Sequence, residues 1–391
     1  MSTASVSTTL SGERSVLWKQ VWALATLQAV NNFGFAAYYH YQPKLLERFN
    51  YVDFAMMLVV LQGIIGIILN PVMGVIGDKL RRTTNKSFTL VSIGTNAAGM
   101  VFMAVAAVMT QKTQEGFFHE IFPICVTLWL ITMAIFNSPA VSLLKSFAPN
   151  NDDLPKATAI MTLVGGVIAA LHPFLFLITD MLGLPITFAL GGLLLMTASN
   201  ILRRLNRQTP DLTEADKVQT PKLTMKLITI FIIGVLNGFI FNLLLDIVPA
   251  ISIKTFHLDK NQDEYIKSVV VFISAVVAWF AGDWIKKLGG VKMTLLGIVV
   301  LMLTLALGIS LPLAAITLIV IIIAGVIRSV LSISMLAYSM SIVSKVNAGR
   351  ATGAFFCGVS AALAISQAAL LKFKAQGGNQ VLLWLESMGI M

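Results

Sequence analysis

The chain has 391 residues, of which 57% are hydrophobic and only 12% are charged, and its formal net charge is +10. Soluble domains carry about 25% charged residues, so this composition excludes a soluble globular protein. Charge-free runs such as residues 295–327 exceed the roughly 20 apolar residues that a helix needs to cross a bilayer. The sequence therefore predicts an all-α membrane protein with many spans.

The N-terminal segment, residues 1–16, is polar, and no small-residue cleavage site follows its first apolar run. We expect a short cytoplasmic tail there and no signal peptide. The apolar segments that follow lie at about 17–40, 53–77, 87–110, 121–144, 157–180 and 184–202, and then at about 224–249, 266–282, 292–310, 312–343 and 350–371. A last segment, 380–391, is too short to cross a bilayer alone.

This pattern predicts two six-helix bundles, with 11 full spans and a short or truncated twelfth. The N-terminal bundle is expected at 1–202 and the C-terminal bundle at 224–391. Between them, residues 203–223 are polar and include two prolines. Such a composition is typical of a flexible tether, and its basic start suits anionic headgroups.

Lysine and arginine residues are divided unevenly between alternate loops. Nineteen of the 28 lie in loops on one side, eight lie on the other side, and Arg328 falls inside a span. Because cytoplasmic loops carry the basic excess, we expect the N-terminus and the linker to be cytoplasmic in a plasma (inner) membrane. The positive net charge is then a topology signal, and no nucleic-acid partner is expected.

One sequence event occurs in both halves of the chain. Residues 70–82 read NPVMGVIGDKLRR and residues 277–287 read VAWFAGDWIKK, so each apolar helix ends in Gly-Asp and a basic cluster. A second pair, KAT at 156–158 and RAT at 350–352, opens the fifth span of each half. The halves are therefore parallel repeats, which transporters use to rock two bundles about a central site.

The pattern GxxxDKxRR at residues 74–82 resembles the signature loop of the major facilitator superfamily, although the glycine that usually precedes the final basic pair is absent. The second half carries the degenerate copy DxxKK at residues 283–287. This resemblance covers nearly the whole chain and implies the superfamily's fold and transport by alternating access. The gating residues that we expect are Asp78, Lys79, Arg81, Arg82, Asp283, Lys286, Lys287 and Arg350.

A carboxylate at the cytoplasmic end of a span can face the positive N-terminal end of a neighbouring helix. The basic residues after Asp78 and Asp283 can meet carboxylates or headgroups. Such contacts would hold a cytoplasmic gate shut and break when the bundles rock. The alternative is that the cations only fix the topology.

Two segments give a narrower resemblance, which covers about a sixth of the chain. Residues 335–367 and 137–159 are similar to parts of sucrose-type proton symporters, with Pro139-Ala140 in place. Val141 stands where that group carries an arginine. The resemblance implies a sugar as the solute and a proton as the coupling ion.

Charged residues inside spans are costly and usually functional. Arg328 is expected near the midplane, where it could bind an anionic group of the substrate or respond to a protonated carboxylate. Asp246 could pair with Arg328 or face outer water, and Asn242 lies one turn before it on the same face. For proton coupling, Asp246 is the first candidate and His172 is the second. The alternative for His172 is a hydrogen-bonded packing role.

Asn31, Phe35 and Tyr38 share one face of the first span, at spacing i, i+4 and i+7. Buried amides beside aromatic rings suit a polar ligand, and interhelical hydrogen bonding is the alternative. Asn137 in the fourth span and Gln367 in the eleventh are further candidates for lining a cavity.

No Walker loop, zinc-ligand spacing, catalytic triad signature or dinucleotide fingerprint occurs in the sequence. We therefore expect neither an enzyme nor a bound cofactor or metal. The expected function is proton-coupled uptake of a small polar or anionic organic solute, for example a sugar. The alternatives are a proton-driven drug or metabolite exporter, an uncoupled facilitator, and a non-transporting receptor or scaffold. The expected partners are the solute, protons and the lipid bilayer, with the chain acting as a monomer.

Overall fold

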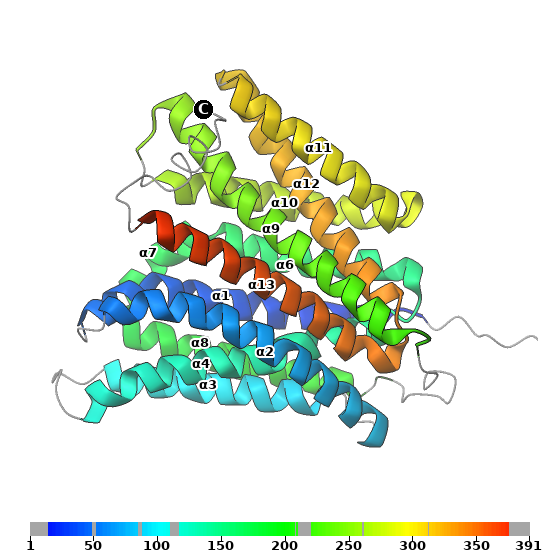
Figure 1. The fold of residues 1–391 in the computed structure, drawn as a ribbon. Helices are drawn as coiled ribbons and strands as arrows, with labels where there is room; N and C mark the ends of the chain where they lie inside the picture. The colour runs from blue at the N-terminus through cyan, green and yellow to red at the C-terminus, as the bar shows by residue number, and fades with distance from the viewer. Residues whose placement is uncertain are drawn as a thin grey trace, which may run out of the picture.

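The structure is a computed structural model, and it describes residues 15–48, 52–84, 88–109, 117–207, 209, 220–259, 262–311 and 313–374. Within these ranges the helices follow one another along the chain (Figure 1). They are α1 (Trp18–Arg48), α2 (Val52–Thr84), α3 (Thr89–Met109), α4 (Phe117–Ser142), α5 (Leu144–Phe147), α6 (Leu154–Ala170), α7 (His172–Leu182), α8 (Leu184–Asn206), α9 (Leu223–Phe256), α10 (Asp263–Leu288), α11 (Gly290–Ser310), α12 (Ala314–Ser341) and α13 (Ala348–Lys374).

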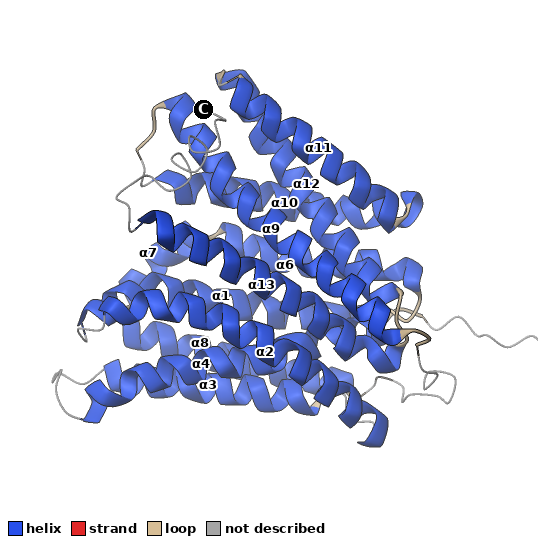
Figure 2. Cartoon of the chain, viewed as in Figure 1, coloured by secondary structure: helices blue, strands red, loops and turns tan. Residues whose placement is uncertain are grey.

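The described residues form helices and no strand (Figure 2). Ten helical segments among them are long and apolar enough to cross a membrane. The helix α1, 31 residues long, is not one of these, because Gln28, Asn31 and Asn32 lower the hydropathy of its middle. The prediction of an all-α, multi-pass membrane protein is confirmed. The expected short segment at 380–391 lies outside the described residues.

The fifth predicted span is not one continuous helix. The helix α6 ends at Ala170 and α7 begins at His172, with Leu171 between them. Pro173 has no N–H group, and its ring would clash with the carbonyl group of Ala169 in a regular helix. The apolar segment expected at about 157–180 is therefore made of two helices, α6 and α7.

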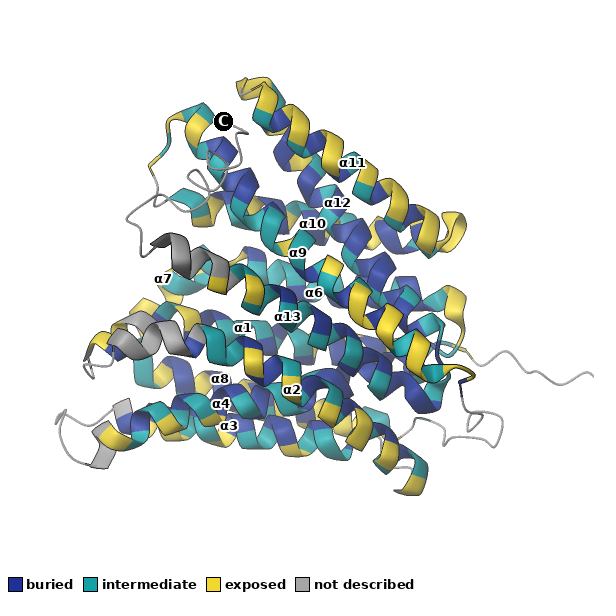
Figure 3. Cartoon of the chain, in the orientation of Figure 1, coloured by how far each residue is buried: buried dark blue, intermediate teal, exposed yellow. Residues whose placement is uncertain are grey.

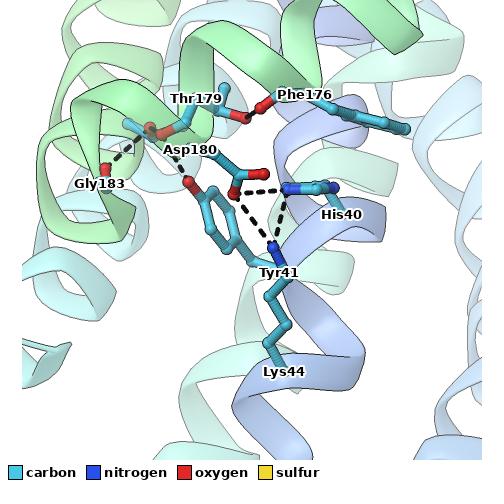
Figure 4. A network of polar contacts seen from close by, with 8 residues as sticks. His40, Tyr41, Lys44, Phe176, Thr179, Asp180 and Gly183 are labelled. Atoms are coloured by element: carbon cyan, nitrogen blue, oxygen red, sulfur yellow. Dashed lines mark hydrogen bonds and ion pairs between the residues drawn. The ribbon is translucent and has the colours of Figure 1, made fainter.

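Contacts with α1 hold the short helix α7 in place (Figure 4). The Tyr41 hydroxyl donates a hydrogen bond of 2.6 Å to the Thr179 carbonyl oxygen inside the protein. Beside this bond, Asp180 Oδ1 lies 2.9 Å from His40 Nε2 and 3.0 Å from Lys44 Nζ. This network ties the outer part of the broken span to the first helix.

We expect Tyr41→Phe to cost about 1 kcal/mol of stability, because it removes one buried hydrogen bond without creating a large cavity. The matched control is Lys44→Gln, which removes an ion pair whose two side chains are about half exposed, and such pairs contribute little. Thermal unfolding of the purified protein in detergent measures both variants. If both variants are destabilised equally, the buried hydrogen bond contributes no more to stability than the half-exposed ion pair.

The helices form two bundles, each with its own main core, and a smaller buried cluster that includes Ala159 of α6 and Ala278 of α10 lies between them. In the first bundle, α1–α8, the buried side chains include Phe102, Phe136 and Leu195. In the second bundle, α9–α13, they include Leu244 and Val320. Apolar residues on the outer faces are largely exposed, as a lipid-facing surface requires (Figure 3).

The most extensive contacts between the bundles are those of α2 with α13 and of α6 with α10, and smaller ones join α4 to α13 and α6 to α12. The helix α13 therefore lies against α2 although the two are far apart in the sequence (Figure 1). Thr220, just before α9, donates to Ser344 Oγ at 3.0 Å, so the end of the linker lies beside the start of α13. We call the membrane side on which α8 ends and α9 begins the linker side.

Candidate functional site

The backbones of α2 and α13 approach so closely on the linker side that glycine is needed at their contact. A Cβ atom on Gly74 would collide with the Gly349 carbonyl oxygen. A Cβ atom on Gly353 would lie 2.7 Å from the Asn70 carbonyl oxygen. This close approach brings the beginning of α13 within reach of Asp78.

Asp78 binds the N-terminus of α13 through both oxygens of its carboxylate. Its Oδ1 accepts from the Gly349 backbone N–H at 2.8 Å, and its Oδ2 accepts from the Arg350 backbone N–H at 2.9 Å. N–H groups in the first turn of a helix have no partner within the helix, and the positive helix end favours a carboxylate. Asp78 itself is only 2% exposed. We call this contact the backbone latch.

Two arginines extend the backbone latch. Arg81 donates to the Lys345 carbonyl oxygen at 2.9 Å, and Arg82 donates to Asn347 Oδ1 at 2.6 Å. Lys79 is exposed, and within the described part of the chain its side chain makes no hydrogen bond or ion pair to the second bundle. For Arg350, the backbone N–H, and not the side chain, meets Asp78.

The equivalent junction of α10 with α6 is built from side chains. Asp283 forms an ion pair of 2.9 Å with Lys156, and Lys286 forms one of 2.9 Å with Asp153. Pro155, at the start of α6, has no backbone N–H to donate, so Asp283 meets a lysine ammonium. All four side chains are partly exposed, and Lys287 is exposed without a described contact. We call this junction the side-chain latch.

Two further polar contacts cross between the bundles nearer the membrane interior. Pro71 cannot donate to the Ile67 carbonyl oxygen as a regular helix would require, and Cys357 Sγ of α13 donates to that oxygen at 3.3 Å. The Thr352 hydroxyl donates to the Ser138 carbonyl oxygen of α4 at 3.1 Å. The two bundles are therefore closed together on the linker side.

A cavity of about 250 Å³ lies between the bundles beyond these contacts. It is bordered by α1, α2 and α4 of the first bundle and by α13 of the second. Its lining residues are Gln28, Asn31, Asn32, Phe35, Gln62, Ile65, Gly66, Asn70, Leu130, Met133, Ala134, Asn137, Phe356, Val359, Ser360 and Leu363. These described lining residues include six carboxamides and one serine, and none of them is charged.

A family model described as Major Facilitator Superfamily matches residues 97–367. The chain belongs to the major facilitator superfamily. A comparison with curated proteins found no match.

Three solved structures of transporters share this fold at low sequence identity. The human organic anion transporter MFSD10 (TETRAN) is 10% identical, with a TM-score of 0.68 over 90% of this chain and 92% of that one. A bacterial homologue of the iron transporter ferroportin, in an outward-facing state, is 14% identical, with a TM-score of 0.66 over 90% and 91%. A bacterial homologue of the human lysosomal transporter Spinster, inward-facing and unoccupied, is 12% identical, with a TM-score of 0.57 over 93% and 85%. At such identities the similarity shows the fold alone.

The structure brings some of the predicted cavity residues of this major facilitator together. Asn31, Phe35 and Asn137 all line the cavity between the bundles. Tyr38 does not, because its ring stacks on Trp129 at 4.5 Å inside the first bundle and is 5% exposed. Gln367 lies on α13, but its side chain is outside the described part of the structure.

The predicted residues of the second bundle lie elsewhere. Arg328 donates to Ser274 Oγ at 3.0 Å, and its guanidinium lies 4.6 Å from the centre of the Phe241 ring. Among the described residues Arg328 forms no ion pair, so the expected pairing with Asp246 is absent. Asn242 donates to Ser366 Oγ at 3.4 Å, which joins α9 to α13.

His172 is the first residue of α7, beside the break in the fifth span. Its ring stacks on Phe176 at 5.9 Å, and its Nε2 atom is buried without a hydrogen-bond partner. The residue as a whole is partly exposed, and histidine is a common proton relay. The geometry leaves both of the interpretations offered by the sequence open to experiment.

Sequence reasoning did not propose Gln28, Gln62, Asn70 or Ser360 as lining residues. Each of them is an isolated polar residue in an apolar helix, where hydropathy averages conceal it. The usable signal is that an amide inside a span requires a hydrogen-bonding partner. Applied to the amides of α1 and α2, that criterion includes Gln28, Gln62 and Asn70, whereas Ser360 on α13 is a hydroxyl and is not selected by it.

Proposed function

We propose that this major facilitator takes up a small polar organic solute, of the kind a sugar represents, by alternating access and in symport with protons. The observation that carries the proposal is the polar cavity between the two bundles. On the linker side the bundles are held together by hydrogen bonds and ion pairs, which can break. A solute held there can leave when the latches open and the bundles rock.

The basic excess on the linker side supports a cytoplasmic linker. Closed latches would then separate the cavity from the cytoplasm, as uptake requires before solute binds. The narrow resemblance of residues 137–159 and 335–367 to sucrose-type symporters supports a sugar-like solute. His172, ionisable and unpartnered at Nε2, supports coupling to protons.

The test uses the full chain in proteoliposomes that are preloaded with one unlabelled solute from a panel of sugars, carboxylates, amino acids and lipophilic cations. We expect labelled sugar-type solute to accumulate by counterflow, and net uptake to rise several-fold when the lumen is made alkaline. His172→Gln should abolish the response to the pH gradient and leave counterflow intact. His40→Gln, in the α1–α7 network, is the matched control.

Three outcomes would contradict this proposal in different ways. Counterflow that never responds to a pH gradient would mean uncoupled facilitation. Transport of lipophilic cations alone, out of the vesicles, would mean an exporter. Binding without flux would mean a receptor.

A further inference from the structure

The hydrogen bonds of the individual amides that line the cavity between the bundles indicate which groups a solute must have. Asn32 Nδ2 donates to the Gly165 carbonyl oxygen at 2.9 Å, and Gln28 Nε2 donates to Asn32 Oδ1 at 3.5 Å. Gln62 Nε2 donates to the Tyr39 hydroxyl at 2.6 Å. The amide of Asn32 is therefore used at both ends by the protein itself.

Two other amides present an acceptor without a partner. Asn31 Oδ1 and Asn70 Oδ1 are buried and accept no hydrogen bond from the protein. The residues are only 3% and 4% exposed, respectively, and both line the cavity. Buried polar atoms are almost always hydrogen-bonded, so two unpaired acceptors bordering one cavity require an external donor.

The hydrogen bond of the Asn70 side chain decides which of its two amide atoms is the oxygen and which is the nitrogen. Its Nδ2 atom donates to the Gly66 carbonyl oxygen at 2.8 Å, and a carbonyl oxygen can only accept. Exchanging the oxygen and nitrogen of this amide would place two acceptors against each other. Oδ1 is therefore the free atom, and any ligand that bonds to it has to act as the donor.

The cavity also lacks a counter-charge. None of the described residues that line it is charged, and Arg328, a candidate anion ligand, hydrogen-bonds to Ser274 inside the second bundle. Burying an unpaired charge beside neutral amides is strongly unfavourable. A hydroxyl group, in contrast, donates to an amide oxygen and also accepts, while Phe35 and Phe356 offer apolar surface to C–H groups.

We infer that the solute is an uncharged polyhydroxylated molecule that donates a hydrogen bond to Asn70 Oδ1 and hydrogen-bonds to the Asn31 amide. This inference rests on the proposed transport function and adds to it the charge of the solute, the two residues that bind it and the direction of the hydrogen bond at Asn70. In the absence of solute, water occupies these acceptors, and a ligand without donors cannot replace it without loss.

The test is binding to the purified full chain in detergent, by thermal shift and calorimetry. The neutral probes are a hexitol, a hexose and a disaccharide. The charged counterparts are a hexonate for the hexitol, and a hexuronate and an amino hexose for the hexose. We expect binding by at least one neutral probe and binding at least tenfold weaker by its charged counterpart. Asn31→Leu and Asn70→Leu should each weaken the neutral probe about tenfold.

The unliganded variants separate binding from folding. An unpaired acceptor stabilises nothing, so Asn31→Leu without ligand should unfold at or above the wild-type temperature. Asn96→Leu is the matched control, because Asn96 on α3 donates to the Ser92 carbonyl oxygen outside the cavity, and it should leave affinity unchanged. If Asn31→Leu lowers the unfolding temperature and leaves affinity unchanged, the amide is structural and the inference is wrong.

The remaining outcomes distinguish this inference from the proposed function. If charged solutes bind and are transported while neutral ones are not, the inference fails and the transport function stands. If a neutral solute binds but is never carried across the membrane, the inference stands and the transport function fails. If no probe of any class binds or moves, both are rejected.

Discussion

Asp78→Asn is expected to increase the rate at which a maleimide labels Cys357 by about thirtyfold. An asparagine keeps one acceptor, but its NH2 group would face a backbone N–H of α13, and the charge at the helix N-terminus is lost. The closed arrangement should lose about 2 kcal/mol, which is about thirtyfold in population. Cys357, bonded to α2 across the interface, then becomes accessible. The chain has two cysteines, so Cys125→Ser makes Cys357 the only thiol.

Two variants serve as controls for Asp78→Asn. Lys79→Gln removes a neighbouring exposed charge and should leave labelling unchanged. Asp283→Asn opens the side-chain latch, whose ion pairs are partly exposed; its effect should stay below about threefold and shrink as salt rises. Equal acceleration by Asp283→Asn and Asp78→Asn would show that the backbone latch does not dominate closure.

Gly74→Ala is expected to prevent the bundles from closing, with little loss of folding stability. The added methyl group would collide with the Gly349 carbonyl oxygen, and the bundles can relieve that collision by moving apart. Gly234→Ala is the matched change inside the second bundle, where the methyl group would collide with the Phe355 carbonyl oxygen. That collision cannot be relieved by rocking, so the variant should lose about 1–3 kcal/mol of folding stability.

Two measurements on the same preparations separate these effects. Cys357 labelling should accelerate strongly in Gly74→Ala and only weakly in Gly234→Ala, while thermal unfolding should show the opposite order. Transport by Gly74→Ala should fall at least tenfold, because a carrier that cannot close one side cannot complete its cycle. Normal transport by this variant would mean that the close α2–α13 contact is not part of the cycle.

The fold class and the placement of Asp78 at the end of a span could both be predicted from the sequence, and each prediction has a physical reason. Charge-free runs of this length can only be helices in a bilayer, and an acidic residue at a helix end seeks unpaired N–H groups. The break after Ala170 was missed because hydropathy does not register the N–H group that Pro173 lacks. The partner of Asp78 required knowledge of which helices pack together, which local sequence does not contain.

The cavity was only partly predictable. Asn31 and Phe35 were found because their spacing places them on one face of α1. Asn70 and Ser360, on α2 and α13, meet them only after the two halves have packed. The contacts of Arg328 with Ser274 and Phe241 were not predictable, because residue spacing gives depth in the membrane but not the direction in which a side chain points, and its role stays a prediction.

The two latches should show different patterns of sequence conservation among homologues. Asp78 binds main-chain N–H groups, and every residue except proline at position 350 supplies the same donor. Homologues should therefore keep the acid at position 78 while position 350 drifts, constrained only by the small neighbour at 349. The Lys156–Asp283 pair depends on both side chains. Those two positions should change together, and in some lineages they should exchange their charges.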